Sequence, residues 1–437
     1  MSLLSAPRMW RDVAALFTST GPPGTPDLIG VEIELIPVTR GSDPRPVRLF
    51  ESAARAPSLQ GLLQDWARSS GLIHDERRGP GDLRFRTIHG GWITFEPGGQ
   101  LELSSAPRPT PSAAFAEVVS VLDPLREAAY AAGVKLVGRG LNPWHDVQDV
   151  PLQVESPRYH AMDEYLRRYG PDGARMMRLT AAMQINLDFG NPAQANRRWR
   201  VANLLSPVIR GSFANSRLRL ENGSEAVSGR SVIWERTDTS RTGALVATGP
   251  DAEGSPASQY LDFARAAHVM IRQDTEGTAT AAEPELRFED WVGGESPPAP
   301  DLSDWETHLS TLFPDVRPRG WLELRAIDAP RRRWWAVPLT VLPAVLLDDE
   351  AVSLTLEILE PLAPHIADLA RRAGVEGLRA GPVGEAAEQV FLAALEAAHR
   401  RPPGYFSTEM LAATVDFFQR YIVNRRTQAD DESGVDS

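Results

Sequence analysis

Several segments of this chain alternate apolar residues with acids or amides, and this pattern limits the possible fold more than any other feature. In GVEIELIP, Glu32 and Glu34 alternate with valine, isoleucine and leucine. In TFEPGGQLELS, Glu96 and Glu102 flank a Pro-Gly-Gly turn. Successive side chains of a β-strand point to opposite faces of a sheet. The pattern therefore predicts strands with one apolar face and one face of acids and amides.

Two further segments repeat this design. In AMQINLDFG, Gln184 and Asn186 alternate with isoleucine and leucine, and in GWLELRAID, Glu323 and Arg325 alternate with leucines. An antiparallel sheet with one solvated face would explain the alternation. It explains the composition less well, because lysine is absent from these segments while acids and amides dominate.

A bound cation is the alternative explanation for so many acids. If the segments are neighbouring strands, five carboxylates converge, namely Glu32, Glu34, Glu96, Glu102 and Glu323. Carboxylates a few ångströms apart repel each other by about 1 kcal/mol or more per pair. Hard divalent cations remove this repulsion, and oxygen-only ligands favour Mg²⁺ or Mn²⁺ over zinc. The acidic face is therefore predicted to bind a metal ion and a nucleotide.

One short segment holds several arginines that could complement this face. SGRSVIWERTDTSRTG contains Arg230, Arg236 and Arg241. A guanidinium group offers a planar set of donors that fits carboxylates and phosphates. Exposed arginines on a loop are the simpler interpretation. Beside a metal-binding face, we expect these arginines to bind phosphate or carboxylate.

Composition excludes several other chemistries. The chain has no cysteine, so disulfides, iron–sulfur clusters, thiolate zinc sites and a cysteine nucleophile are ruled out. Its net charge of −12 disfavours general binding to nucleic acids or anionic membranes. We find no complete P-loop and no Gly-x-Ser-x-Gly motif. Of the histidines, only His145 and His308 are considered as candidate functional residues. The chain start has no long apolar core, and a soluble cytoplasmic protein is expected.

Helical and strand-like segments alternate along the chain. Helices are predicted over Pro111–Tyr130, from a cap at Ser156 to Gly170, over Arg197–Ala214, and over Glu385–Arg400. Residues 275–300 are predicted to form a loop, and residues 429–437 a disordered acidic tail. The expected fold is a single α+β unit over residues 1–428, with a mixed sheet covered by helices.

Several long motifs, in this order, resemble the glutamate–cysteine ligases of the plant and bacterial type. They span Gly30 to Asp328 and read GVEIEL, ITFEPGGQLELSSAP, SPRYHAMDEYL with GARMMRLTAAMQINLDFG, RSVIWERTDTSRTG, and DWETHLSTLFPDVRPRGWLELRAID. The version RPRGWLELRAIDA is more similar to the ligases of ergothioneine biosynthesis than to those of the glutathione branch.

This resemblance implies a fold and a reaction. The fold would be a curved, mostly antiparallel sheet that forms an active-site funnel covered by helices, similar to the catalytic sheet of glutamine synthetase. ATP would phosphorylate the γ-carboxylate of glutamate, and the amine of cysteine would attack the γ-glutamyl phosphate. Mg²⁺, or Mn²⁺ in its place, would neutralise charge on the transferred phosphoryl group.

The resemblance also implies roles for individual residues. The metal ligands would be Glu32, Glu34, Glu96, Glu102 and Glu323. The residues that bind glutamate or ATP would be Gln184, Asn186, Arg230, Arg236 and Arg241. Arg325 would stabilise the transferred phosphoryl group, and Arg241 would share in catalysis.

Other interpretations remain open at this point. The ligase could serve glutathione synthesis or use a different amine, because the motifs do not identify the cysteine pocket. The chain could also be an inactive protein that binds a magnesium–nucleotide complex. Its oligomeric state is not predicted. The disulfide switch that regulates the plant enzymes cannot operate in a chain that has no cysteine.

Overall fold

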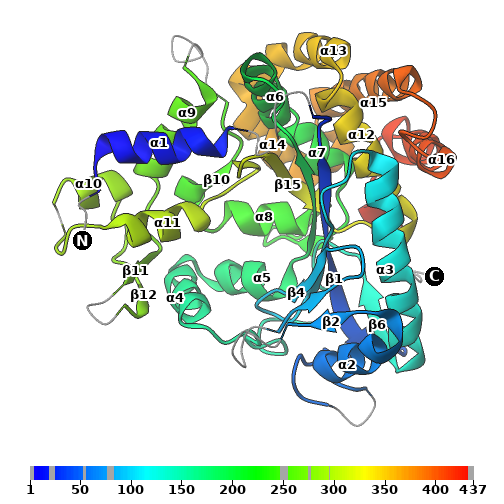
Figure 1. The fold of residues 1–437 in the computed structure, drawn as a ribbon, viewed down its shortest axis with the longest axis horizontal. Coiled ribbons are helices and arrows are strands. Elements are labelled where there is room, and N and C mark those ends of the chain that lie inside the picture. Colours follow the sequence, from blue (N-terminus) through cyan, green and yellow to red (C-terminus); the bar gives the residue numbers. More distant parts are fainter. Residues whose placement is uncertain are drawn as a thin grey trace.

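A nine-stranded sheet with helices on both sides lies at the centre of the protein (Figure 1). The computed structural model describes residues 4–18, 25–52, 56–75, 83–246, 254–273, 277–294 and 296–431. The strands of the large sheet are β1 Ile29–Thr39, β2 Ile73–His74, β3 Phe85–Arg86, β4 Trp92–Phe95, β5 Leu101–Ser104, β6 Val134–Val137, β7 Ala182–Leu187, β14 Val316–Pro318 and β15 Leu322–Asp328.

The strand order makes neighbours of the segments that alternate acids with apolar residues. It runs β14-β15-β7-β1-β5-β4-β3-β2, and β6 pairs with the second half of β1. Every pairing in this sheet is antiparallel. The predicted α+β class with a mostly antiparallel sheet is therefore confirmed. Smaller two-stranded pairs join β8 Leu218–Arg219 to β9 Glu225–Ala226, β10 Thr242–Gly243 to β13 Phe313–Pro314, and β11 Ile271–Gln273 to β12 Ala279–Ala281.

Sixteen α-helices are present in the described part of the chain. They are α1 Ala6–Leu16, α2 Leu59–Ser70, α3 Pro111–Ala131, α4 Pro157–Leu166, α5 Pro171–Leu179, α6 Pro192–Leu204, α7 Ser206–Ser212, α8 Gly229–Glu235, α9 Pro256–Ala266, α10 Phe288–Val292, α11 Leu302–Ser310, α12 Ala336–Leu346, α13 Asp349–Leu359, α14 Ile366–Glu376, α15 Pro382–Arg400 and α16 Thr408–Phe417.

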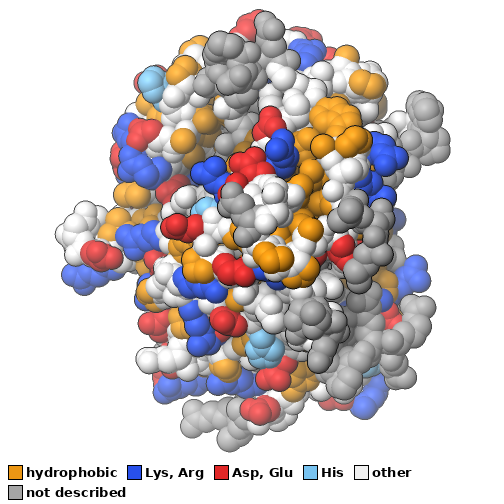
Figure 2. All heavy atoms as spheres, turned by 90° about the vertical axis from the view of Figure 1, so that its left-hand side faces the viewer, with side chains coloured by type: hydrophobic (Ala, Val, Ile, Leu, Met, Phe, Trp, Pro, Cys, Tyr) orange, Lys and Arg blue, Asp and Glu red, His pale blue; other side chains and the backbone are white. Residues whose placement is uncertain are grey.

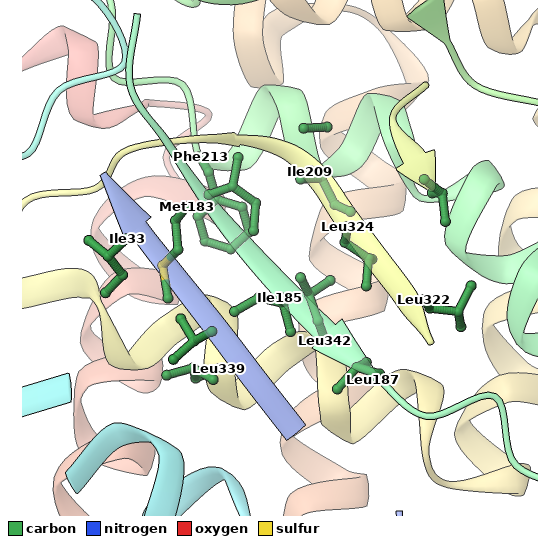
Figure 3. Packing of buried hydrophobic residues seen from close by; sticks show 14 of the residues in the cluster. Ile33, Met183, Ile185, Leu187, Ile209, Phe213, Leu322, Leu324, Leu339 and Leu342 are labelled. Carbon is green, nitrogen blue, oxygen red and sulfur yellow. The ribbon is translucent and has the colours of Figure 1, made fainter. Parts of the chain in front are cut away.

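The apolar face of the sheet packs on helices from the middle and the C-terminal part of the chain. Ile185 of β7 and Leu324 of β15 are fully buried, and Leu339 of α12 and Phe213, which directly follows α7, belong to the same core cluster (Figure 3). In Figure 1, α3 and α12 lie on one side of the sheet, while α4, α5 and α8 lie on the other. The acids and amides of the strands therefore face α4, α5 and α8.

Local sequence signals explain several helix boundaries. The α4 helix starts where predicted, because the Ser156 hydroxyl accepts a hydrogen bond from the Tyr159 N–H and caps the helix. The helix predicted over Arg197–Ala214 is instead two helices, α6 and α7. The first begins at Pro192 behind an Asn191 capping box, and Pro207 lies in the first turn of the second.

The prediction of one long loop over residues 275–300 is wrong for part of this range. Strand β12 pairs with β11, and the short helix α10 buries Phe288 and Trp291 in the core. The glycines and prolines of this stretch lie between these elements rather than replacing them. Composition alone could not reveal that two aromatic side chains fix the segment to the core.

The predicted acidic tail begins later than expected. Ala429 is buried, and the Asp431 carboxylate accepts a hydrogen bond from the Tyr421 hydroxyl at 2.5 Å. Residues 432–437 of the predicted tail lie outside the described residues. In the part of the chain that the structure describes, no helix is long and apolar enough to cross a membrane. On the face drawn in Figure 2, acidic and basic side chains are interspersed.

Candidate active site

Three glutamates from two strands and a turn meet on the polar face of the sheet. Antiparallel pairing sets Glu34 of β1 opposite Glu102 of β5, and Glu96 directly follows β4, the next strand. One carboxylate oxygen from each of these residues lies within 4.8 Å of the other two. Glu32, two residues earlier in β1, lies opposite Gln184 of β7. The structure thus brings four of the five predicted metal ligands to adjoining positions.

The Pro-Gly-Gly turn between β4 and β5 packs so closely on its neighbours that only glycine fits at positions 98 and 99. A Cβ atom on Gly98 would lie 2.2 Å from the carbonyl oxygen of Arg178, so the turn backs directly onto the end of α5. Gly99 has a φ of +84°, and a Cβ atom there would lie 2.5 Å from the Gln153 side chain. These contacts hold Glu96 beside the strands that carry the other carboxylates.

Burial and mutual repulsion change the protonation of this group. Burial, followed by repulsion from neighbouring carboxylates, raises the pKa values of Glu34, Glu96 and Glu102 to about 8 each. Burial and then the charge of Glu323 also raise the pKa of Glu32. The three clustered side chains offer only carboxylate oxygens as ligand atoms, and Mg²⁺ and Mn²⁺ prefer oxygen ligands. The donor set therefore fits the predicted divalent cation.

Glu323 has a different environment from the one predicted. Its Oε2 accepts a hydrogen bond from Arg317 Nε at 2.5 Å, and its Oε1 accepts one from Arg325 Nη1 at 3.1 Å. Burial alone would raise the pKa of Glu323, but Arg325 and Arg317 lower it to about 2. Register explains the pairing, because β14 sets Arg317 directly opposite Glu323. In this structure its oxygens pair with arginines, and its role as a metal ligand stays a prediction.

The two amides predicted to bind substrate instead orient carboxylates in this structure. Gln184 Nε2 donates to Glu34 Oε1 at 2.7 Å, and Asn186 Nδ2 donates to Glu32 Oε1 at 2.9 Å. The Trp321 indole N–H donates to Asn186 Oδ1 at 3.1 Å, which fixes the amide orientation. Of the two, Gln184 also lines the cavity described below.

Only one of the three arginines in SGRSVIWERTDTSRTG lies at the site. Arg230, in the first turn of α8, lines the cavity and donates to the carbonyl oxygen of Arg325 at 3.0 Å. Burial lowers the pKa of Arg230, although the carboxylates of Asp328 and Glu34 partly offset this effect. It is the member of the segment that could contact a phosphate or carboxylate.

The predicted binding roles of Arg241 and Arg236 do not fit their positions. Arg241 is 1% exposed, and it donates to Asp238 Oδ2 at 2.9 Å and to the Thr311 carbonyl oxygen at 2.6 Å. Its guanidinium group is thus occupied by structural contacts. Arg236 is exposed and lies 3.7 Å from Asp172. Both residues follow the end of α8, and neither lines the cavity.

The carboxylates open into a cavity of about 260 Å³. It is lined by Glu32, Glu34, Glu96, Pro97, Gln100, Glu102, Arg158, Tyr159, Met162, Met176, Met177, Thr180, Gln184, Arg230, Trp234, Phe313, Arg317, Arg319 and Arg325. Among these lining residues, Arg158, Arg317 and Arg319 were not predicted from the sequence. Arg317 and Arg319 alternate along the chain just before GWLELRAID, and this spacing could have identified them.

A second cavity of about 370 Å³ adjoins the first. The two share Arg230, Trp234, Phe313 and Arg325 as lining residues. The second cavity is also bounded by α14 through Ala367, Ala370 and Arg371. A long ligand that contacts the carboxylates in the first cavity could therefore extend into the second.

The two histidines that the sequence singled out have structural roles. His145 is within hydrogen-bond distance of the Pro44 carbonyl oxygen and of Asn142, away from the carboxylates. His308 is buried and stacks on Phe288. Burial lowers the pKa of His308 to about 3, so this residue is neutral at physiological pH. Neither histidine lines the first cavity.

Comparison with known proteins places the chain in a family. The model of glutamate–cysteine ligase family 2 matches residues 28–411. A chloroplastic glutamate–cysteine ligase of Solanum lycopersicum is 36% identical over 253 residues, which cover 56% of this chain and 47% of that protein. The protein of the same name from Arabidopsis thaliana is 33% identical over 333 residues, which cover 74% of this chain and 62% of that protein. The chain thus spans less than two thirds of the length of these relatives.

A solved structure gives a more distant likeness. The crystal structure of a glutamate–cysteine ligase from Francisella tularensis in complex with AMP has a TM-score of 0.48 and 13% sequence identity, and the match covers 92% of this chain and 83% of that one. This likeness is too weak to carry an argument. The family assignment rests on the sequence match instead, which covers most of the chain: this protein belongs to glutamate–cysteine ligase family 2.

Proposed function

We propose that the protein is an ATP-dependent ligase that joins the γ-carboxylate of glutamate to the amine of cysteine. The observation that carries this proposal is the cavity in which the carboxylates of Glu34, Glu96 and Glu102 face a group of arginines. A metal-binding group and a cationic group in one cavity suit the transfer of a phosphoryl group to an anionic acceptor. Membership of the ligase family supports the same reaction.

The carboxylates and arginines would divide the charges of the reactants between them. Glu34, Glu96 and Glu102, with Glu32 beside them, would hold Mg²⁺ or Mn²⁺. Such an ion supplies charge neutralisation to the phosphates of ATP. Arg230 and Arg325 line the cavity and would contact the transferred phosphoryl group or a carboxylate of glutamate. Further cationic side chains line the same cavity, namely Arg158, Arg317 and Arg319.

The reaction would proceed in two balanced steps. An oxygen of the γ-carboxylate of glutamate attacks the γ-phosphorus of ATP, and ADP leaves with the electrons of the broken P–O bond. The amine nitrogen then attacks the γ-carbonyl carbon and forms the amide bond. Phosphate leaves with the electrons of the C–O bond, and the proton that the nitrogen loses passes to phosphate. The arginines stabilise negative charge in both steps.

The pathway and the cellular location are finer parts of the proposal. The segment RPRGWLELRAIDA supports a role in ergothioneine biosynthesis, and glutathione synthesis is the alternative. The plant relatives carry the word chloroplastic in their names. For this protein we propose the cytoplasm, on the sequence pattern alone. We also propose one catalytic domain, predicted over residues 1–428 and extended by the buried Ala429 and the hydrogen-bonded Asp431.

A product assay tests the reaction. Purified protein is incubated with Mg²⁺, ATP, glutamate and cysteine, and ADP release and the mass of γ-glutamylcysteine are measured. We expect ADP release to depend on cysteine, and we expect Glu102→Gln to abolish it. Glu127→Gln, a change on an exposed part of α3, is the matched control and should keep full activity. Turnover with another amine would change the substrate, and absence of turnover with every amine would favour an inactive nucleotide-binding protein.

A further inference from the structure

The helix side of the first cavity carries a cluster of three methionines. Met162 lies on α4, and Met176 and Met177 lie near the end of α5. All three line the cavity and also belong to the hydrophobic cluster beneath these helices. The sheet side of the same cavity, in contrast, carries carboxylates, amides and the arginines of β14 and β15. The cavity therefore has a methionine wall that faces a polar and charged sheet side.

Several polar contacts hold the methionine wall in a fixed position. The Asp163 carboxylate binds both Arg167 on its own segment and Arg178 near the end of α5, which ties α4 to α5. Gln100 Nε2 donates to the Thr180 carbonyl oxygen at 2.8 Å, and the Thr180 hydroxyl donates to the Met176 carbonyl oxygen at 2.6 Å. These contacts connect the wall to the turn that carries Glu96. The distance between the apolar wall and the carboxylates is thereby set by the fold.

The chemistry of the proposed reaction indicates which reactant needs this wall. The phosphates of ATP and the carboxylates of glutamate are anions, and the arginines and a divalent cation suit them. The amine that attacks the γ-carbonyl carbon must lie in the same cavity, together with the side chain that it carries. Methionine offers flexible, polarisable contacts to apolar groups and sulfur, and it cannot neutralise a charge.

We propose that Met162, Met176 and Met177 form the surface against which the side chain of the amine substrate lies. This inference rests on the proposed ligase function. It assigns these methionines as specificity-determining residues and restricts the amine substrate to an amino acid with a short, uncharged side chain such as a thiol or a methyl group. One methylene more or less in an apolar pocket changes kcat/KM by roughly 10-fold to 200-fold.

Wild-type protein provides the first test. We expect 2-aminobutyrate, in which a methyl group replaces the thiol of cysteine, to be used within about 10-fold of cysteine, because dispersion contacts dominate an apolar wall. Serine, whose hydroxyl group would lose its water without gaining a partner on this wall, should be poorer by more than about 10-fold. Equal use of serine and 2-aminobutyrate would overturn the inference.

Variants provide the second test. Met176→Ala should enlarge the space and raise the kcat/KM ratio of norvaline to cysteine by about 10-fold or more. Met176→Leu, which conserves volume, should keep the wild-type ratio even if the alanine variant folds poorly. Met270 is buried in the same hydrophobic cluster but does not line the cavity, so Met270→Ala is the matched control and should also keep the ratio.

A trapping assay separates failure of the inference from failure of the proposed function. Hydroxylamine, which has no side chain, captures γ-glutamyl phosphate as the γ-glutamyl hydroxamate. We expect Met270→Ala to form hydroxamate at the wild-type rate, and we expect Met176→Ala to change the amine preference but not the KM values for glutamate and ATP. A changed KM for glutamate or ATP with an unchanged amine preference would assign the wall to that reactant and overturn the inference. Absence of hydroxamate from wild-type protein would instead refute the proposed function, and the inference with it.

Discussion

Without a metal ion, the clustered carboxylates of Glu34, Glu96 and Glu102 should destabilise the folded protein. The substitution Glu96→Gln tests this directly. Glu96 is suited to the test because it is near Glu34 and Glu102 but makes no hydrogen bond to them. Glutamine keeps the size of the side chain and removes its charge. In metal-free solution the variant should therefore be more stable than the wild-type protein.

The pKa of Glu96 sets the size and the sign of this effect. Burial and then the charge of Glu34 raise its pKa from 4.5 to about 8 in the folded protein. A group whose pKa is raised on folding favours the folded state below the unfolded pKa and loses that contribution as pH rises to the folded pKa. At about 1.4 kcal/mol per pKa unit, the charge on Glu96 lowers the free energy of unfolding by about 1 kcal/mol at pH 5 and by about 3 kcal/mol at pH 7. Solvent screening at this partly exposed side chain makes both figures upper limits.

Urea unfolding with EDTA at pH 5 and pH 7, followed by tryptophan fluorescence, measures the difference. The stability gained by Glu96→Gln should be larger at pH 7 than at pH 5, and Glu127→Gln should gain nothing at either pH. Adding Mg²⁺ should stabilise the wild-type protein more than the variant. A variant that is no more stable than wild type at pH 7, or whose gain does not grow with pH, would refute the reasoning.

Three further predictions concern residues whose roles are structural. Arg241→Met should destabilise the protein by about 3–5 kcal/mol in thermal unfolding, because it leaves the buried Asp238 without its ion pair, and the KM for glutamate of the folded fraction should not change. A changed KM for glutamate would instead indicate that Arg241 takes part in substrate binding. Gly98→Ala should lower both stability and activity, since its Cβ atom would collide with the carbonyl oxygen of Arg178; a variant with wild-type unfolding and turnover would contradict the close approach. For His308, burial lowers the folded pKa from 6.5 to about 3, so its contribution to stability is present above pH 6.5 and is lost as pH falls through this window. Wild type should therefore lose up to about 1.4 kcal/mol per pH unit relative to His308→Asn between pH 6 and pH 4, and parallel pH profiles would argue against a buried neutral histidine.

Much of the sheet could be predicted because alternation is a property of adjacent residues. Glu32 and Glu34 share a strand face whatever the strand packs against, and Glu102 follows the same rule. Caps such as Ser156 act over three or four residues and are visible in the sequence for the same reason. The family motifs added the reaction that this face is proposed to serve.

The sequence was least informative where a side chain has more than one possible partner. Glu323 alternates along its strand like the other glutamates, yet β14 places an arginine opposite it, and Arg317 and Arg325 pair with its carboxylate. Arg230 and Arg241 belong to one motif, but a helix end lies between them and only Arg230 reaches the cavity. Spacing along the chain does not reveal which opposite charge is closest in space.

The sequence by itself determined which residues share a strand face, that the chain is an α+β protein without cysteine chemistry, and that an acidic face needs positive charge. Only the tertiary structure decided that Glu34, Glu96 and Glu102 meet within 4.8 Å, that Arg317 and Arg325 neutralise Glu323, and that a methionine wall completes the cavity. The physical reason is the distance along the chain over which each effect acts. Alternation and capping act between neighbours in the chain, whereas register, ion pairing and burial depend on how separate strands and helices pack against one another.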